Sequence, residues 1–295
     1  MNLFSRSMLA LSTVAMMGTA AIAQEATPFS AADFEYGPRY NVEGEIEVWN
    51  TAKQKLLAGE DIIGGTVRTN NPRIYCSMAN AGYDFIWVEM QHEQTNWESV
   101  AAMYRECPDA PAVPGVRIAE TTEREFQRAM DAGAMVIVVP TIDTVEEAEE
   151  AVQWTMFPPM GRHSAGGGQF SSFYADVPGG YRNTFNENVV LILMIETLEG
   201  VENVEEIAKV EGVDALFIAS GDLGNFSGYE PGQPEYEALV DRIANAATSN
   251  GKKVCGPLGW RTEREGFSCF QAGADLSLVR AAAEREIEAS TPASN

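Results

Sequence analysis

The chain has 295 residues, of which 45% are hydrophobic, and this length allows one large domain with a sizeable core. Its formal net charge of −23 argues against nucleic-acid binding, because a phosphate backbone requires clustered lysine and arginine, and against binding to an anionic membrane surface. An anionic substrate would therefore need a local positive centre, supplied by an arginine or a metal ion.

The first 23 residues have the features of a secretory signal peptide. Arg6 lies in a short polar start, an apolar run extends from Met8 to Ile22, and Ala21 and Ala23 provide the small residues of a cleavage site. The run is short and is broken by Ser, Thr and Gly, which argues against a retained membrane anchor. We expect cleavage after Ala23, export to the periplasm or the medium, and no membrane association of the mature chain.

The rest of the chain divides into three parts. Residues 24–45 are polar, and we expect them to form an extended lead-in. We expect residues 46–285 to form one folded domain and residues 286–295 to form a flexible tail. The domain contains eight short runs rich in Val, Ile and Leu that lack strict polar alternation, which is typical of strands buried on both faces of a parallel sheet. The predicted strands are 62–67, 85–90, 112–118, 135–142, 189–196, 215–220, 253–259 and 276–281.

Segments with helical periodicity lie between these runs. Three of them begin with the spacing of a capping box, at Thr95–Glu98, Thr122–Glu125 and Thr144–Glu147. Eight strands alternating with helices predict a single α/β domain with the (β/α)8 TIM-barrel fold, although a doubly wound sheet would share much of this pattern.

One connection, residues 160–188 between the fourth of these helices and the fifth strand, is long and rich in glycine. Loops of this length are usually functional lids or binding loops, and a flexible insertion is an almost equally good interpretation of the composition. His163 lies in this loop, where we expect it to be exposed to solvent.

The four cysteines form no CxxC pair. In an oxidising compartment, Cys76–Cys107 and Cys255–Cys269 are the disulfides nearest in sequence, and buried free thiols are the alternative.

Polar groups gather at the predicted C-terminal ends of the strands, the face on which TIM barrels place their active sites. Strands five and six are neighbours, so Glu196 and Asp222 should lie side by side, and two such carboxylates would repel each other without a cation between them. Oxygen-only ligation favours Mg²⁺ or Mn²⁺ over zinc. Each group alone has a structural explanation, such as a helix cap or an ion pair. Their convergence favours a site, whose other candidates are Glu89, Gln91, His92 and Arg117.

These motifs resemble the HpcH/HpaI-type family of metal-dependent pyruvate aldolases, which cleave 2,4-dihydroxyhept-2-ene-1,7-dioate and related hydroxy-keto acids. The similarity extends from about Trp49 to Glu284. It is carried by AGYDFIWVEMQH, VRIAE, AMDAGAMVIVVP, FPPMGRH, MIETLEGVENVEEIAKVEGVDALFIASGDLG and AGADLSLVRA, in that order.

The resemblance implies that Glu196 and Asp222 ligate a divalent cation, Mg²⁺ or Mn²⁺, which binds the carboxylate and keto oxygen of pyruvate and acts as a Lewis acid. It implies that Arg117 places positive charge beside the enolate oxygen. It also implies that the backbone N–H groups around Gly221 and Asp222 hold the substrate carboxylate.

By the same resemblance, His92 is the general base and Asp131 orients it. Two positions depart from the family pattern: Gln91 replaces a common Glu before the histidine, and Met194 replaces a Gln that faces substrate in some members. Both departures leave the metal pair and Arg117 intact and leave the substrate open.

The prediction is a class II carbon–carbon lyase that cleaves a 2-oxo-4-hydroxy acid to pyruvate, or a related 2-oxo acid, and an aldehyde. The alternative is an exported protein that binds a metal and a 2-oxo acid without turnover. A lyase acting on a thioester would need a basic groove for a nucleotide, which the acidic chain does not offer. The resemblance also implies a homo-oligomer (dimer, trimer or hexamer) in which C-terminal helices are exchanged between partners.

Overall fold

A computed structural model describes residues 30, 37 and 44–290 of the chain. The predicted signal peptide lies outside the described residues, as do most of the lead-in and residues 291–295. Within the described part, no helix combines the length and apolar character needed to cross a bilayer.

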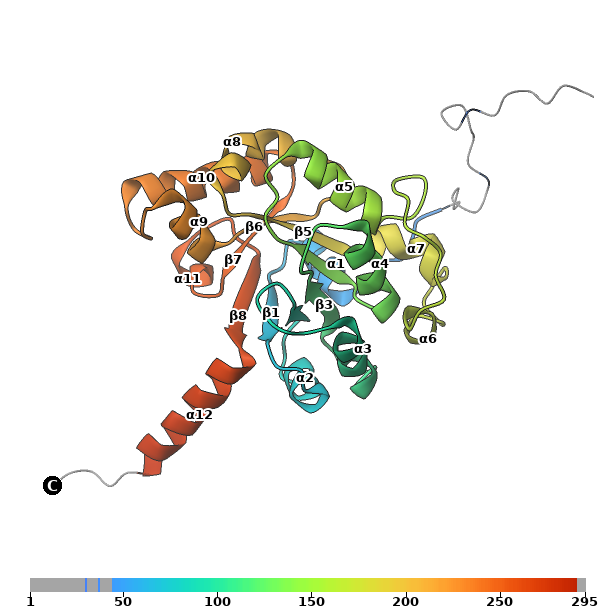
Figure 1. Ribbon diagram of the computed structural model, residues 1–295, viewed down its shortest axis with the longest axis horizontal. Coiled ribbons are helices and arrows are strands. Elements are labelled where there is room, and N and C mark those ends of the chain that lie inside the picture. The colour runs from blue at the N-terminus through green and yellow to red at the C-terminus, as the bar shows by residue number, and fades with distance from the viewer. Residues whose placement is uncertain (1–29, 31–36, 38–43, 291–295) are drawn as a thin grey trace, which may run out of the picture. The chain divides into compact units, whose positions relative to one another are not determined.

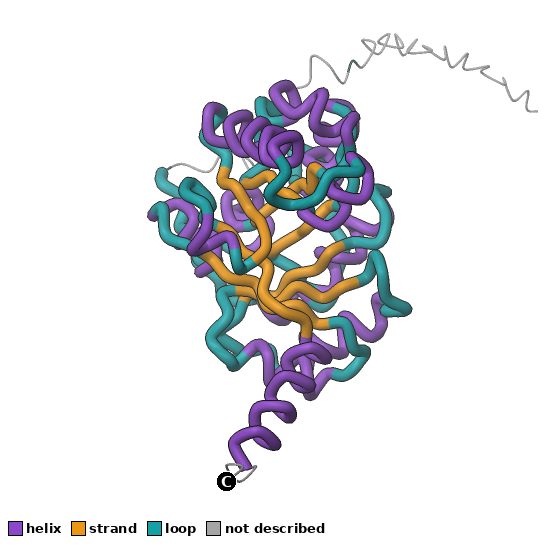
Figure 2. Tube along the Cα trace, turned by 90° about the vertical axis from the view of Figure 1, so that its left-hand side faces the viewer, coloured by secondary structure: helices purple, strands orange, loops and turns teal. Residues whose placement is uncertain are grey.

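Eight parallel strands close into a barrel in which each strand pairs with its neighbour in the chain and β8 pairs with β1 (Figures 1 and 2). This closure confirms the (β/α)8 barrel and excludes the doubly wound sheet. Most strand residues are buried, because helices cover the outer face and side chains fill the interior. The strands are β1 (Ile62–Val67), β2 (Phe85–Glu89), β3 (Val113–Arg117), β4 (Val136–Val139), β5 (Val190–Ile195), β6 (Ala215–Ile218), β7 (Lys253–Pro257) and β8 (Cys269–Ala274).

Helices surround this barrel, as Figure 2 shows. They are α1 (Thr51–Ala58), α2 (Pro72–Ala79), α3 (Trp97–Glu106), α4 (Glu123–Ala132), α5 (Val145–Thr155), α6 (Phe170–Phe173), α7 (Tyr181–Asn188), α8 (Leu198–Ile207), α9 (Ser220–Ser227), α10 (Pro234–Ser249), α11 (Trp260–Glu263) and α12 (Asp275–Ser290). Helix α12 thus continues five residues into the predicted tail.

The eighth strand is not where the sequence pattern placed it. The run 276–281 lies in α12, and β8 is the less apolar segment CFQAGA, which pairs with both β1 and β7. A short apolar run does not distinguish a strand from one face of a helix. Pairing with β1 on one side and with β7 on the other identifies Cys269–Ala274 as the eighth strand.

The predicted helix starts are only partly correct. Thr144 and Glu147 form the complete capping box of α5. Helix α3 instead begins one residue later than predicted, with the side chain of Asn96 accepting a hydrogen bond from the N–H of Ser99, and Thr122 makes no side-chain cap. Asparagine accepts this bond as well as threonine does, so the capping-box spacing alone did not identify the cap.

The long glycine-rich connection is ordered into α6 and α7 and packs away from the C-terminal ends of the strands. The side-chain amide of Gln169 donates to the carbonyls of Ala101 and Ala132, and the hydroxyl of Tyr174 donates to the carbonyl of Gly133. These partners lie in α3 and at or just beyond the C-terminal end of α4. The segment is therefore not a lid over the barrel mouth of the same chain.

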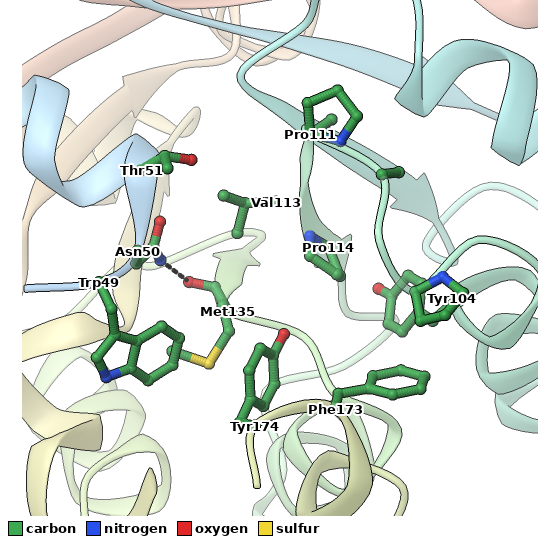
Figure 3. Close-up of a pocket in the computed structure, with 13 residues that line it drawn as sticks. Trp49, Asn50, Thr51, Tyr104, Pro111, Val113, Pro114, Met135, Phe173 and Tyr174 are labelled. Carbon is green, nitrogen blue, oxygen red and sulfur yellow. Dashed lines mark hydrogen bonds between the residues drawn. The ribbon is translucent and has the colours of Figure 1, made fainter. Parts of the chain in front are cut away.

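A cavity of about 200 Å³ lies at the N-terminal ends of the strands (Figure 3). Asn50 and Met135 both line it, and the side-chain amide of Asn50 donates a hydrogen bond of 3.2 Å to the carbonyl of Met135. The hydroxyls of Tyr104 and Tyr174 already donate to backbone carbonyls. This cavity is at the opposite end of the barrel from the predicted site. Its aromatic side chains are those of Trp49, Tyr104, Phe173 and Tyr174.

Candidate active site

Two cavities of about 200 Å³ each lie at the C-terminal ends of the strands, and both are lined by His92, Arg117 and Gln271. The first continues toward the start of α9, at Gly221 and Asp222. The second continues toward the ends of β1 and β8. The fold thus brings His92, Arg117, Gly221 and Asp222 to one end of the barrel, as the sequence predicted.

Glu89, at the end of β2, holds this site together. Its buried carboxylate accepts hydrogen bonds from Arg117 Nε (2.8 Å), from the backbone N–H groups of Gln91 (2.7 Å) and His92 (3.1 Å), and from the indole of Trp87 (3.2 Å). The guanidinium of Arg117 also lies 5.2 Å from the centre of the Trp87 ring. Glu89 therefore fixes both the arginine and the loop that carries the histidine. The sequence marked it as a strand-end acid without a role.

Glu196, after β5, is 2% exposed and is held by a residue from a different strand end. The backbone N–H and the hydroxyl of Thr141 both donate to its Oε1, at 2.7 Å each. Its other oxygen, Oε2, is buried and has no hydrogen-bond partner among the described residues. No motif in the sequence indicated Thr141, because the contact joins loops 55 residues apart.

The environment of Glu196 raises the pKa of its carboxyl above 4.5. Burial is the main cause, and the negative charge of Asp222 adds to it. The hydrogen bonds from Thr141 and the charge of Arg117 act in the opposite direction. Strands β5 and β6 pair side by side, so the segments that carry Glu196 and Asp222 begin at neighbouring strand ends.

Helix α9 presents its N-terminus to the first cavity. Gly221 and Asp222 lie in its first turn, where backbone N–H groups have no intrahelical acceptor, and these two make no hydrogen bond within the described part of the chain. Free N–H groups at a helix N-terminus favour an anion.

The ring of His92 is exposed and makes no hydrogen bond to any described residue. It lines both cavities, beside Arg117.

Asp131 is not brought to His92 within this chain. Helix α4 runs away from the barrel mouth, and Asp131 lies eight residues after its start, about 12 Å along the axis. Its carboxylate accepts a hydrogen bond from Gln127 and lies against Gly166, where a Cβ atom would come within 2.6 Å of its Oδ1. The predicted orienting contact is therefore absent between these residues of one chain.

His163 is buried, contrary to the expectation of a solvent-exposed side chain. It is 7% exposed, its Nδ1 lies 3.3 Å from the carbonyl of Trp154, and its ring packs edge-on against Phe157. Burial lowers its pKa to about 4. It faces α4 and α5 rather than the barrel mouth.

The acids at the mouth fit a hard divalent cation. Glu196 offers one buried oxygen without a partner, Asp222 is half-buried nearby, and the donors are all oxygen. Within residues 44–290, no group of three or more Asp, Glu, His or Cys side chains forms a metal-binding cluster. A cation here would therefore have two protein ligands, which leaves coordination positions for substrate and water.

Comparison with known proteins agrees with this geometry. The family model for HpcH/HpaI aldolase/citrate lyase matches residues 66–277. The chain is 30% identical over 207 residues to a hydroxypyruvate/pyruvate aldolase of Pseudomonas aeruginosa, covering 69% of this chain and 76% of that protein. It is 28% identical over 243 residues to a 4-hydroxy-2-oxo-heptane-1,7-dioate aldolase of Escherichia coli, covering 80% and 92%.

A solved structure is also similar. The crystal structure of an HpcH/HpaI aldolase/citrate lyase family protein from Burkholderia cenocepacia aligns with a TM-score of 0.74 at 31% identity, over 82% of this chain and all of that one. The fold, the matched residues and the extent of these similarities agree, and this chain belongs to the HpcH/HpaI aldolase/citrate lyase family.

Proposed function

We propose that this protein is a divalent-metal-dependent aldolase that cleaves a 2-oxo-4-hydroxy acid to pyruvate, or a related 2-oxo acid, and an aldehyde. The observation that carries the proposal is the unpartnered Oε2 of Glu196 beside Asp222, within the field of Arg117. The relatives named above are aldolases for pyruvate and for an oxo-dioate, which supports the reaction class.

Glu196 and Asp222 would hold Mg²⁺ or Mn²⁺. When bound, the cation would supply Lewis-acid polarisation of the substrate keto group. The N–H groups of Gly221 and Asp222 would bind the substrate carboxylate, since both residues line the first cavity and their N–H groups have no acceptor among the described residues.

Arg117 would stabilise negative charge that develops on the keto oxygen. Glu89 binds it through Nε (2.8 Å) and Nη2 (2.5 Å), so Nη1, which lies 3.7 Å from the sulfur of Met194, is the terminal nitrogen not engaged by that carboxylate. His92 would accept the proton of the substrate 4-hydroxyl during cleavage and return a proton to C3 of the product. An imidazole titrates near neutral pH, which suits both directions.

The alternative function is a protein that binds metal and a 2-oxo acid without turnover. It is favoured by one observation: the ring of His92 makes no hydrogen bond to any described residue that would orient it as a base.

An exchange experiment separates the two functions. Purified mature protein is incubated with pyruvate, Mn²⁺ or Mg²⁺ and D₂O, and the methyl signal of pyruvate is followed by NMR. An aldolase exchanges the methyl protons, and exchange stops with EDTA and in His92→Ala and Glu196→Gln. Gln94→Ala, an exposed change in the same loop, is the matched control and should exchange normally. Binding of pyruvate without exchange would establish the alternative.

We also propose that the mature chain is a homo-oligomer. Helix α12 extends away from the barrel (Figure 1), and Asp275 is its only buried residue within the described chain. Leu276 and Val279 are 61% and 58% exposed, and they lie three residues apart on one face. Sedimentation velocity should show an oligomer for the wild type and a smaller species for Leu276→Glu/Val279→Glu. A wild-type monomer would disprove this proposal.

A further inference from the structure

The loop that carries the proposed general base, residues 90–96, is held by few hydrogen bonds. At its start, the buried carboxylate of Glu89 accepts from backbone N–H groups that include that of His92. At its end, the side chain of Asn96 caps α3. Between these two points, one hydrogen bond joins the loop to another segment of the described chain, and it is made by the side chain of Glu93. The path of the backbone just after the histidine therefore depends on this contact.

The partner of Glu93 is Arg68, in the loop after β1. Its Nε donates to Oε1 of Glu93 at 2.5 Å, and the side chain of Arg68 donates to no other described residue. Arg68 also lines the second cavity at the barrel mouth, together with His92 and Arg117. The ion pair thus joins two loops at the rim of the site, and its acid directly follows the histidine in the chain.

The backbone at Arg68 is fixed by a buried acid from the other end of the chain. Asp275, at the start of α12, is 2% exposed, and its Oδ1 accepts a hydrogen bond from the N–H of Arg68 at 3.2 Å. Its Oδ2 accepts from the N–H (3.2 Å) and the hydroxyl (2.6 Å) of Thr69. The loop after β1 is therefore anchored at the residue that holds Glu93.

This anchor matters because the ion pair is partly exposed. The side chains of Arg68 and Glu93 are 47% and 26% exposed, and exposed ion pairs usually contribute little, since ordering two long side chains costs entropy. The backbone of Arg68 is already fixed, so less freedom remains to be lost when the pair forms.

The ring of His92 has no hydrogen-bond partner of its own among the described residues. The backbone that carries the ring therefore sets its position relative to a bound substrate. Displacement of a reacting group by about 1 Å can lower a rate by about 100-fold. A contact that fixes the residue next to His92 should thus affect proton transfer more than it affects binding of the 2-oxo acid.

We propose that Arg68 and Glu93 are positioning residues, which hold the loop after β2 so that the imidazole of His92 reaches the reacting atoms. This inference rests on the proposed aldolase function. Glu93 lines neither cavity at the barrel mouth, so its effect passes through the loop. The support for the proposed base extends from Asp275 through the loop after β1 to Glu93.

The test measures exchange of the pyruvate methyl protons in D₂O, with Mn²⁺ or Mg²⁺, as a function of pyruvate concentration. Arg68→Gln and Glu93→Gln should each lower kcat by about 10-fold, less than a displacement of a full ångström would, and leave KM for pyruvate unchanged. The double variant should lose about as much as either single variant, because both changes remove the same contact. Arg68→Lys keeps the positive charge and should recover part of the loss.

The matched control is Arg261→Gln, which breaks an ion pair of similar exposure. The side chains of Arg261 and Asp61 are 46% and 34% exposed, and neither residue lines a cavity at the barrel mouth. This variant should keep the kcat and KM of the wild type. Circular dichroism establishes that each variant is folded before its rates are compared.

The outcomes separate the two proposals. Absence of metal-dependent exchange in the wild type would overturn the aldolase function, and the role of Arg68 and Glu93 with it. Three results, each with normal exchange in the wild type, would overturn the positioning role alone: an unchanged kcat in Glu93→Gln, losses that multiply in the double variant, or a change confined to KM.

Discussion

Thr141 donates two hydrogen bonds of 2.7 Å to one oxygen of Glu196, and the second oxygen of that carboxylate has no partner among the described residues. Thr141 has a φ of +50°, in the left-handed region that β-branched residues rarely adopt. Such a conformation has an energetic cost of about 1–3 kcal/mol. It persists here because it directs both donors of the residue at the same acceptor, which fixes the carboxylate and leaves Oε2 without a hydrogen-bond partner among the described residues, where the proposed cation would bind.

Replacing Thr141 with valine removes the hydroxyl hydrogen bond and keeps the shape of the side chain. We expect the affinity of the protein for Mn²⁺ to fall by about 10-fold, because groups that orient a metal ligand typically contribute 10- to 100-fold. Isothermal titration calorimetry measures this affinity. Thr248→Val, at an exposed position on α10, is the control and should bind Mn²⁺ normally. If Thr141→Val and Thr248→Val bind Mn²⁺ with equal affinity, the hydroxyl of Thr141 is not needed to position Glu196.

Metal affinity should also depend on pH through Glu196. Burial raises the pKa of this carboxyl above 4.5, so the folded protein holds the proton to higher pH than an unfolded chain does. The affinity for Mn²⁺ should therefore rise as pH increases through the window above 4.5, where the carboxyl loses its proton. Without metal, stability should fall over the same window, because the folded state binds more protons than the unfolded state. In Glu196→Gln, this fall in stability should be smaller.

The buried pair of Glu89 and Arg117 should be strongly coupled. Glu89→Gln leaves the charge of Arg117 buried without a counter-ion, which should lower the free energy of unfolding by about 3–5 kcal/mol. Adding Arg117→Met should restore part of this loss. The double variant should therefore lose less unfolding free energy than the two single variants lose together. Urea denaturation measures the unfolding free energy of both single variants and of the double variant.

The matched control for this cycle is Glu205→Gln, which breaks an exposed pair with Arg242 and should change stability by less than about 1 kcal/mol. Additive losses at Glu89 and Arg117 would contradict the coupling.

His163 should make stability decrease at mildly acidic pH. Burial lowers its pKa from 6.5 to about 4, so between these values the unfolded chain binds a proton that the folded protein does not. Stability should be lost as pH falls from about 6.5 toward 4, by about 1–3 kcal/mol from this residue alone. His163→Asn removes the titrating ring, so its stability should fall less steeply over this range. If the unfolding free energy of the wild type and of His163→Asn falls equally steeply with decreasing pH, other groups cause the pH dependence.

The cysteines should oxidise in two defined pairs. All four are free thiols in the structure, and Cys255 lies directly opposite Cys269 in the ladder between β7 and β8. Burial and the neighbouring thiol of Cys76 raise the pKa of Cys107 to about 12, which places these two side chains together as well. Treatment with diamide followed by peptide mass spectrometry should yield Cys76–Cys107 and Cys255–Cys269. The half-buried pair, Cys76–Cys107, should form first because the other is fully buried. Any cross-pairing would contradict this geometry.

The sequence by itself was sufficient for the alternation of strands and helices, while only the closure of the sheet excluded the doubly wound alternative. Seven of the eight predicted strands overlap observed ones, because a strand buried on both faces requires a continuous apolar run that is visible without any partner. The same reasoning placed Glu196 and Asp222 at neighbouring strand ends, and His92 and Arg117 at the same mouth. In this barrel, strands that follow each other in the chain are also neighbours in the sheet. The order of the apolar runs in the sequence therefore already indicated which strand ends lie side by side.

Only the tertiary structure decided which residues support that site. Pairing with β1 and β7 identified β8, and the packing of the 160–188 segment buried His163. The direction of α4 separated Asp131 from His92, and closure of the barrel brought Thr141 to Glu196 and Asp275 to Arg68. These contacts join residues up to 207 positions apart in the chain. Such hydrogen bonds and buried contacts form only when the folded backbone brings distant segments together. The residue types alone do not specify which distant segments will meet.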